Sequence, residues 1–146
     1  MHSLHSNGVV ILDFGSQYTQ LIARRVRELN IFSEILPPDS SIQDILEQKP
    51  KALILSGGPS SVYETTAPNY DQKIFTLEIP ILGICYGLQL MVHYYGGKVK
   101  SSAHGEYGFA QVEIEQSNNL FYQVPQRMKV WMSHMDTVDR IPEDWI

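Results

Sequence analysis

The chain is poor in cysteine, in long apolar runs and in charge of either sign. Its 146 residues hold one cysteine, and 11 Lys and Arg stand against 16 Asp and Glu, a net charge of −5. That balance argues against a general binder of nucleic acid, which needs a positive surface. No apolar stretch approaches the roughly 20 residues of a membrane-spanning helix. One cysteine excludes an internal disulfide and suits a reducing compartment, so we expect a cytoplasmic protein.

The two ends of the chain differ from its middle. Residues 1–8 lack the basic and long apolar regions of a secretory signal, and we interpret them as a flexible lead-in. Residues 9–146 have the length of one domain with its own core. The chain stops on Trp145 and Ile146, although natural termini are usually polar. We therefore expect a domain that is incomplete at its C-terminus.

Apolar runs alternate with segments of helical spacing through the first two thirds of the chain. Strands are predicted at 9–13, 32–36, 51–56 and 81–84, helices at 18–29, 42–48, 70–77 and 86–95, and shorter β-like segments at 98–101, 111–115 and 129–132. Four alternations predict an α/β fold with a mostly parallel, doubly wound sheet and helices on both faces. Ligands of such sheets bind beyond the carboxyl ends of the strands, here near residues 13–16, 56–59 and 83–87.

The most specific motif is Gly-Ile-Cys-Tyr-Gly at 83–87, between a predicted strand and a predicted helix. It has the pattern of a nucleophile elbow that carries a thiol in place of a hydroxyl. Backbone N–H groups and the dipole of the helix N-terminus would favour the thiolate of Cys85. A lone cysteine is more often an inert core residue, but the elbow context favours a nucleophile.

A second motif, Ser-Gly-Gly-Pro at 56–59, follows another predicted strand. Two glycines let the backbone approach a ligand and direct N–H groups at an anion. We predict that this loop supplies one half of an oxyanion hole and that the N–H of Tyr86, just after the nucleophile, supplies the other. A plain tight turn is one alternative. The other is the Ser-Gly-Gly-x-Asp-Ser loop of ATP pyrophosphatases, but here the Asp is missing and no amphipathic helix follows.

A nucleophilic cysteine usually needs a histidine base and an orienting acid. His134 and Asp136 are two residues apart, and such side chains rarely hydrogen-bond through their tips, so a polar substrate-binding loop at 133–136 is the better interpretation. His104, in a Gly/Ser loop, is a weak candidate for the base, and His93 belongs to the core or surface of a helix. No spacing of His, Cys, Asp and Glu indicates a metal site.

Gln89 lies one helical turn after Cys85 and therefore on the same face of the predicted helix. It could hydrogen-bond a substrate amide near the thiol. The alternative is a partly buried polar residue without a role in binding.

The chain resembles the class I, triad-type glutamine amidotransferases and, more narrowly, the amidotransferase domains of GMP synthases. The segments that carry this resemblance, in matching order and spacing, are 11–20, 55–60, 83–89, 107–113 and 130–136. The resemblance implies that Cys85 attacks the side-chain amide of glutamine, that ammonia leaves, and that water hydrolyses the glutamyl thioester. It also implies oxyanion donors at Gly58 and Tyr86, and glutamine-binding residues at Gly57, Gln89, Ser133, His134, Met135 and Asp136.

The resemblance further implies a partner. In the complete enzyme an ATP-pyrophosphatase domain, normally in the same polypeptide, adenylates XMP with ATP and Mg and uses the ammonia to form GMP. No cofactor is expected in this chain itself, and neither nucleic acid nor a membrane is expected as its partner.

Two departures from the family pattern matter. The family's catalytic His and Glu lie in a downstream His-Pro-Glu segment, and this chain ends before it, so we expect the chain alone to be inactive. Met135 stands where the family usually has Gly and would strain the backbone if φ there were positive. The alternatives are a non-catalytic domain that binds glutamine or a partner and has lost the triad, and a cysteine hydrolase of another elbow-bearing α/β family.

Overall fold

The computed structural model describes residues 7–146, apart from the side chain of Ala103. These residues form two compact units, 7–99 with 138–146, and 100–137. The predicted lead-in at 1–8 lies outside the described residues except for Asn7 and Gly8. The Asn7 N–H donates to the Lys49 carbonyl (3.2 Å), and the Gly8 carbonyl accepts from the Lys51 N–H (2.8 Å).

The first unit is built on a four-stranded parallel sheet with strand order β2-β1-β3-β4. Its strands are β1 (Val9–Leu12), β2 (Ser33–Leu36), β3 (Ala52–Leu55) and β4 (Ile81–Gly83). In register, Val9 lies opposite both Ser33 and Ala52. All three strand pairs are parallel, so the carboxyl ends of the four strands lie along one edge. This arrangement confirms the predicted α/β fold.

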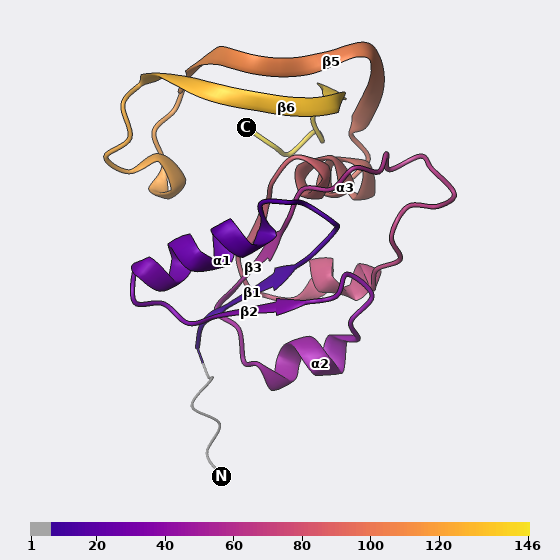
Figure 1. Cartoon of the computed structure of the whole chain (residues 1–146), viewed down its shortest axis with the longest axis vertical. Coiled ribbons are helices and arrows are strands. Elements are labelled where there is room, and N and C mark those ends of the chain that lie inside the picture. Colours follow the sequence, from indigo (N-terminus) through magenta and orange to yellow (C-terminus); the bar gives the residue numbers. More distant parts are fainter. Residues whose placement is uncertain (1–6) are drawn as a thin grey trace. The chain divides into compact units, whose positions relative to one another are not determined.

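Helices cover both faces of the sheet because successive strand residues point to opposite sides. Helix α1 (Thr19–Glu28) packs on one face, where Ala23 meets Ile11 and Ile54. Helices α2 (Ile42–Glu47) and α3 (Tyr86–Tyr94) and the 3-10 helix η1 (Gln72–Thr76) pack on the other. Figure 1 shows α1 and α2 on opposite sides of the sheet. The continuous apolar pattern of β1 and β3 follows from this two-sided burial.

The helix boundaries follow from local capping. The Ser41 hydroxyl accepts from the Asp44 N–H, and the Asp44 carboxylate accepts from the Ser41 N–H, which fixes the start of α2. The predicted α-helix at 70–77 is wrong in type and length, because η1 is a short 3-10 helix. The Asp71 side chain accepts from the Lys73 N–H at its start, and extended backbone at Leu77 ends it after five residues. Its backbone bonds join residues three apart, as from the Ile74 N–H to the Asp71 carbonyl (3.1 Å) and from the Leu77 N–H to the Ile74 carbonyl (3.3 Å).

The second unit consists mainly of two paired strands, β5 (Lys98–Glu113) and β6 (Arg127–Arg140), whose outermost residues belong to the first unit. The connection between them contains the 3-10 helix η2 (Asn119–Phe121). The three short β-like segments predicted here are therefore parts of two long strands. Polar residues interrupt the alternating pattern, but backbone pairing between the strands does not depend on the side chains. The predicted loops around His104 and at 133–136 are consequently strand.

Candidate active site at the carboxyl edge of the sheet

Cys85 occupies a strained turn between β4 and α3. Its φ of 49° and ψ of −111° are unusual for a residue with a side chain, and strain of this kind gathers at functional sites. A Cβ added to Gly83 would lie 2.6 Å from the Leu88 nitrogen, and one added to Gly87 would overlap the Leu55 carbonyl. Only glycine permits these two approaches. The structure thus has the elbow geometry that the motif predicts.

Backbone hydrogen bonds join the elbow to the end of β3. The Ile84 N–H donates to the Leu55 carbonyl (3.0 Å), and the Gly87 N–H donates to the Ser56 carbonyl (3.1 Å). These bonds attach the elbow to β3, a strand that has a neighbour on each side in the sheet. The position of the sulfur is therefore set by the fold and not by a mobile loop.

Residues that follow three strands meet beside Cys85. A Cβ built on Gly57, after β3, would lie 3.4 Å from the Cys85 Cβ and 3.6 Å from the Ser16 Oγ. Ser16 follows β1, and Cys85 follows β4. The prediction that these strand ends converge is confirmed. No α-helix lies between Pro59 and Asp71 to supply the N-terminus that a pyrophosphate loop requires.

The predicted oxyanion donors belong to this cluster of strand ends. Tyr86 is the first residue of α3, and its buried ring lies against that of Phe14, with 5.3 Å between centroids. First-turn N–H groups of a helix lack a partner within the helix. Among residues 7–146, neither the Tyr86 N–H nor the Gly58 N–H donates a hydrogen bond to another backbone group. Both are available for an anion, and their role stays a prediction.

Gln89 lies on the face of α3 that carries Cys85. Its N–H donates to the Cys85 carbonyl (3.0 Å), and the residue is 6% exposed. Burial beside the elbow fits a ligand contact and also fits a packed polar side chain. The binding role of Gln89 therefore stays a prediction, as does that of Gly57.

The electrostatic environment of Cys85 differs from the sequence-based expectation. Cys85 is exposed to solvent, but desolvation of its sulfur by neighbouring atoms raises the pKa of the thiol, whereas we expected the helix N-terminus to favour the thiolate. Within the described part of the first unit, no residue forms a hydrogen bond with the sulfur. His93 is the histidine of that part, and its ring lies on the exposed side of α3 against Tyr63, 5.3 Å between centroids. A helix-surface role for His93 is confirmed, and the described part of the first unit places no histidine base beside Cys85.

The predicted glutamine-binding loop at 133–136 is part of β6, so its side chains alternate between two faces. Ser133 and Met135 are exposed, whereas His134 and Asp136 are turned inward. Successive strand residues point to opposite faces, so Ser133 and Met135 lie on one face of β6 and His134 and Asp136 on the other, and the binding role of the four residues stays a prediction. Met135 is not among the described residues with positive φ, and the strain considered for it does not arise.

His134 joins the two strands of the second unit. Its Nε2 lies 3.0 Å from a carboxylate oxygen of Glu106 on β5, and its Nδ1 lies 2.8 Å from the Asp136 carbonyl. The expectation that His134 and Asp136 would not meet through their tips holds, because His134 contacts the backbone of Asp136. Glu106 escaped the sequence analysis because only strand pairing brings it to His134. His104 is exposed on β5.

Ser16 is a second residue that the sequence analysis did not select. Its side chain acts as a local cap, because the Ser16 Oγ accepts from the Tyr18 N–H (3.0 Å). The same side chain also lies beside Gly57 at the converging strand ends. Its place after β1 is the only sequence signal that could have identified it.

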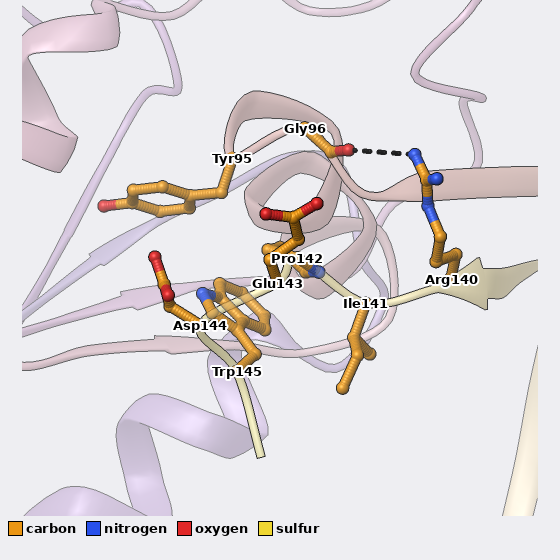
Figure 2. A pocket seen from close by; sticks show the side chains of 8 residues that line it. All are labelled: Tyr95, Gly96, Arg140, Ile141, Pro142, Glu143, Asp144 and Trp145. Atoms are coloured by element: carbon orange, nitrogen blue, oxygen red, sulfur yellow. Dashed lines mark hydrogen bonds between the residues drawn. The ribbon is translucent and has the colours of Figure 1, made fainter.

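A hollow of about 610 Å³ lies elsewhere in the first unit, at the end of α3. Its walls are formed by Tyr95, Gly96 and residues 140–145 (Figure 2). An Arg140 Nη2 to Gly96 carbonyl contact of 3.5 Å and the Tyr95–Trp145 ring pair, 5.8 Å between centroids, shape it. None of the predicted site residues lines this hollow. Residues 7–146 contain no group of three potential metal ligands and no helix suited by length and apolarity to crossing a membrane.

Comparison with known families and curated proteins gives one consistent match. Residues 10–146 match the family described as glutamine amidotransferase class-I. The chain is 54% identical over 135 residues to a GMP synthase [glutamine-hydrolyzing] of Campylobacter jejuni and 57% identical over 135 residues to that of Brachyspira hyodysenteriae. Each alignment covers 92% of this chain and 26% of the relative. The chain thus spans about a quarter of the length of these relatives.

Solved structures agree with this match. A protein of Thermoplasma acidophilum, described as a GMP synthase subunit, has a TM-score of 0.79 and 30% identity, and the match covers 98% of this chain and 71% of that one. A glutamine amidotransferase from Thermotoga maritima has a TM-score of 0.69 and 26% identity, with 97% and 65% covered.

Proposed function

Because this chain belongs to the class-I glutamine amidotransferase family, we propose that it is the part of a glutamine-hydrolysing GMP synthase that releases ammonia from glutamine. The names of the most similar curated relatives support this assignment. Since the chain matches only about a quarter of their length, the synthetase steps belong to the remainder of such proteins. There we place the binding of ATP and Mg, the adenylation of XMP and its amination to GMP.

The observation that carries the proposal is the convergence of Cys85 and Gly57 at the carboxyl edge of the sheet. The Cys85 sulfur attacks the carboxamide carbon of glutamine, and the carbonyl oxygen becomes an oxyanion. The N–H groups of Gly58 and Tyr86 donate hydrogen bonds to this oxyanion, and such stabilisation is the largest single contribution in many acyl transfers. The C–N bond then breaks, protonated nitrogen leaves as ammonia, and water hydrolyses the thioester to glutamate and free thiol.

This chemistry needs a base that the described part of the first unit does not supply. Desolvation raises the pKa of the Cys85 thiol and so disfavours the thiolate, which is the form that attacks readily. We assign the base to the His-Pro-Glu segment that the family resemblance implies, which is not among these 146 residues. A general base contributes typically 10²–10⁴-fold to the rate.

The lack of a base beside Cys85 in the described part of the first unit favours a second candidate function. Such a domain could bind glutamine without hydrolysing it. The two functions differ in turnover and not in binding, so binding and ammonia release must be measured separately.

The decisive experiment compares this chain with a longer chain that contains the His-Pro-Glu segment. Glutamine binding is followed by calorimetry, and ammonia release is followed with glutamine labelled at the amide nitrogen. We expect both chains to bind glutamine and only the longer one to release ammonia rapidly. Cys85→Ser in the longer chain should abolish release and preserve binding.

Three results would change the assignment. Binding without release in the longer chain would establish the non-catalytic function. Absence of glutamine binding in both chains would refute the amidotransferase proposal. Rapid release by the 146-residue chain, lost on His134→Ala or His104→Ala, would place the base in the second unit.

A further inference from the structure

We infer that Ser56 is a positioning residue, whose hydroxyl fixes the Gly57–Gly58 peptide so that the Gly58 N–H faces the reacting carbonyl. The inference rests on the proposed function, in which that N–H binds the oxyanion. Ser56 itself touches neither the substrate nor Cys85 in this account. It acts through the peptide that follows it.

The hydrogen bonds of Ser56 determine where its proton lies. Its side chain is completely buried at the end of β3. The Phe14 N–H donates to the Ser56 Oγ (2.9 Å), and the same Oγ lies 2.8 Å from the Gly57 carbonyl oxygen. An N–H group can only donate and a carbonyl can only accept, so the hydroxyl accepts from Phe14 and donates to Gly57. The direction of the O–H bond is thereby fixed.

This direction determines the orientation of the next peptide. The Gly57 carbonyl and the Gly58 N–H belong to one peptide plane, and no peptide bond among the described residues is cis. In a trans peptide these two groups point in opposite directions. With the carbonyl held by Ser56, the Gly58 N–H faces away from Ser56. The opposite orientation would place a carbonyl oxygen where the oxyanion forms.

Sequence makes such a constraint necessary at this position. Glycine on both sides gives the peptide unusual freedom to rotate, because neither residue has a Cβ. Gly57 lies directly beside Cys85, and a Cβ on Gly58 would overlap the Phe14 carbonyl. Glycine is therefore required at 58, whereas a Cβ at 57 would make only ordinary contacts, and the freedom of the two glycines leaves the peptide orientation to the Ser56 hydroxyl. The hydrogen bond from the Phe14 N–H also holds the Ser56 hydroxyl against the end of β1.

The test compares two reagents that modify Cys85 in the 146-residue chain. One is a chloromethyl ketone analogue of glutamine, with CH₂Cl in place of the amide nitrogen. Its S–C bond forms as chloride leaves and the thiol proton passes to solvent, and its carbonyl oxygen occupies the oxyanion position. The other is methyl methanethiosulfonate, which has no carbonyl. It forms a mixed disulfide and releases methanesulfinic acid.

Ser56→Ala removes the donor, Ser56→Thr retains a hydroxyl, and Thr19→Val is the matched control. Thr19 is also buried and donates to Asp13 (2.8 Å), but it does not contact the Gly57–Gly58 peptide. We expect Ser56→Ala to slow the ketone reaction by about tenfold or more relative to the thiosulfonate reaction, below the 10²–10³ loss for a missing oxyanion donor. Ser56→Thr should restore the ratio, and Thr19→Val should leave it unchanged.

A ratio of rates within one folded variant does not respond to a general loss of stability. An unchanged ratio in Ser56→Ala, or an equal change in Thr19→Val, would overturn the inference. If the parent chain shows no preference for the L-form of the ketone over its D-form, the proposed glutamine site fails instead.

The peptide orientation is then decided by nuclear magnetic resonance, which needs no ligand. Ser56→Ala should shift and broaden the amide signals of Gly57 and Gly58, and Thr19→Val should not. Unchanged glycine signals in Ser56→Ala would refute the inference independently of any reagent.

Discussion

Gly87→Ala provides the sharpest test of how the elbow is built. Gly87 lies in the first turn of α3, against β3. An added Cβ would lie 2.6 Å from the Leu55 Cβ and 2.7 Å from its carbonyl carbon, where ordinary contacts begin at 3.4 Å. The start of α3 would have to withdraw from β3 by about 1 Å, because backbone atoms of both elements are involved.

Two losses and one gain set the change in the free energy of unfolding. Overpacking of a filled core costs typically 1–3 kcal/mol, and contact with backbone places this site at about 3 kcal/mol. The withdrawal also weakens the Gly87 N–H bond to the Ser56 carbonyl, worth about 1 kcal/mol. Alanine gains about 1 kcal/mol over glycine in a helix. The net expectation is a loss of about 3 kcal/mol, against a usual domain stability of about 5–15 kcal/mol.

Urea unfolding followed by circular dichroism at the helix band measures this loss, because α1, α2 and α3 all belong to the first unit. With a slope of about 1–3 kcal/mol per M, the midpoint should fall by about 1 M or more. Gly96→Ala is the control. Its added Cβ would meet nothing within 4 Å, and only its φ of +82° opposes alanine, at about 1–2 kcal/mol. A Gly87→Ala variant no less stable than the Gly96→Ala variant would refute the close-approach argument.

Three further predictions concern other parts of the molecule. Desolvation raises the pKa of the Cys85 thiol above its ordinary 9.0 and the pKa values of Tyr70 and Tyr86 above 10.0, so the folded state holds these protons more tightly than the unfolded chain. The stability is therefore complete below pH 9 and should fall as the pH rises. In urea midpoints, Cys85→Ser should remove the earliest part of that fall. Ser41→Ala removes the hydroxyl that accepts from the Asp44 N–H in the capping box of α2 and should lower the unfolding free energy by about 1 kcal/mol, whereas Ser40→Ala, one residue earlier, should cost less. Phe109→Ala removes an edge-to-face contact with Trp131, 4.9 Å between centroids; at about 1 kcal/mol this should speed amide exchange in β5 and β6 about fivefold, and unchanged exchange would show that the pair does not stabilise the strands.

Much of the first unit was predictable because its elements have strong local signals. The apolar runs of β1 and β3 are buried on both faces, and the spacing of α1 places Ala23 against the sheet while its arginines stay exposed. Helix η1 was mispredicted because apolar spacing at 70–77 does not reveal the length that the caps allow.

The second unit was less predictable for a different reason. Strand pairing satisfies backbone groups at any residue type, so it extends β5 and β6 through polar segments that have no strand pattern. The same pairing divides residues 133–136 between two faces and brings Glu106 to His134. The local sequence of neither strand indicates which residue of the other strand lies opposite.

The sequence by itself determined the parallel α/β sheet and the elbow at Cys85. Both follow from local rules, namely two-sided burial for the strands and glycines at fixed offsets for the turn. Only the tertiary structure decided the chemistry around the thiol. Desolvation depends on which atoms surround the sulfur, and it raises the Cys85 pKa where the helix N-terminus alone suggests a thiolate. The orientation of the Gly57–Gly58 peptide likewise depends on a hydroxyl held by Phe14, 42 residues away along the chain.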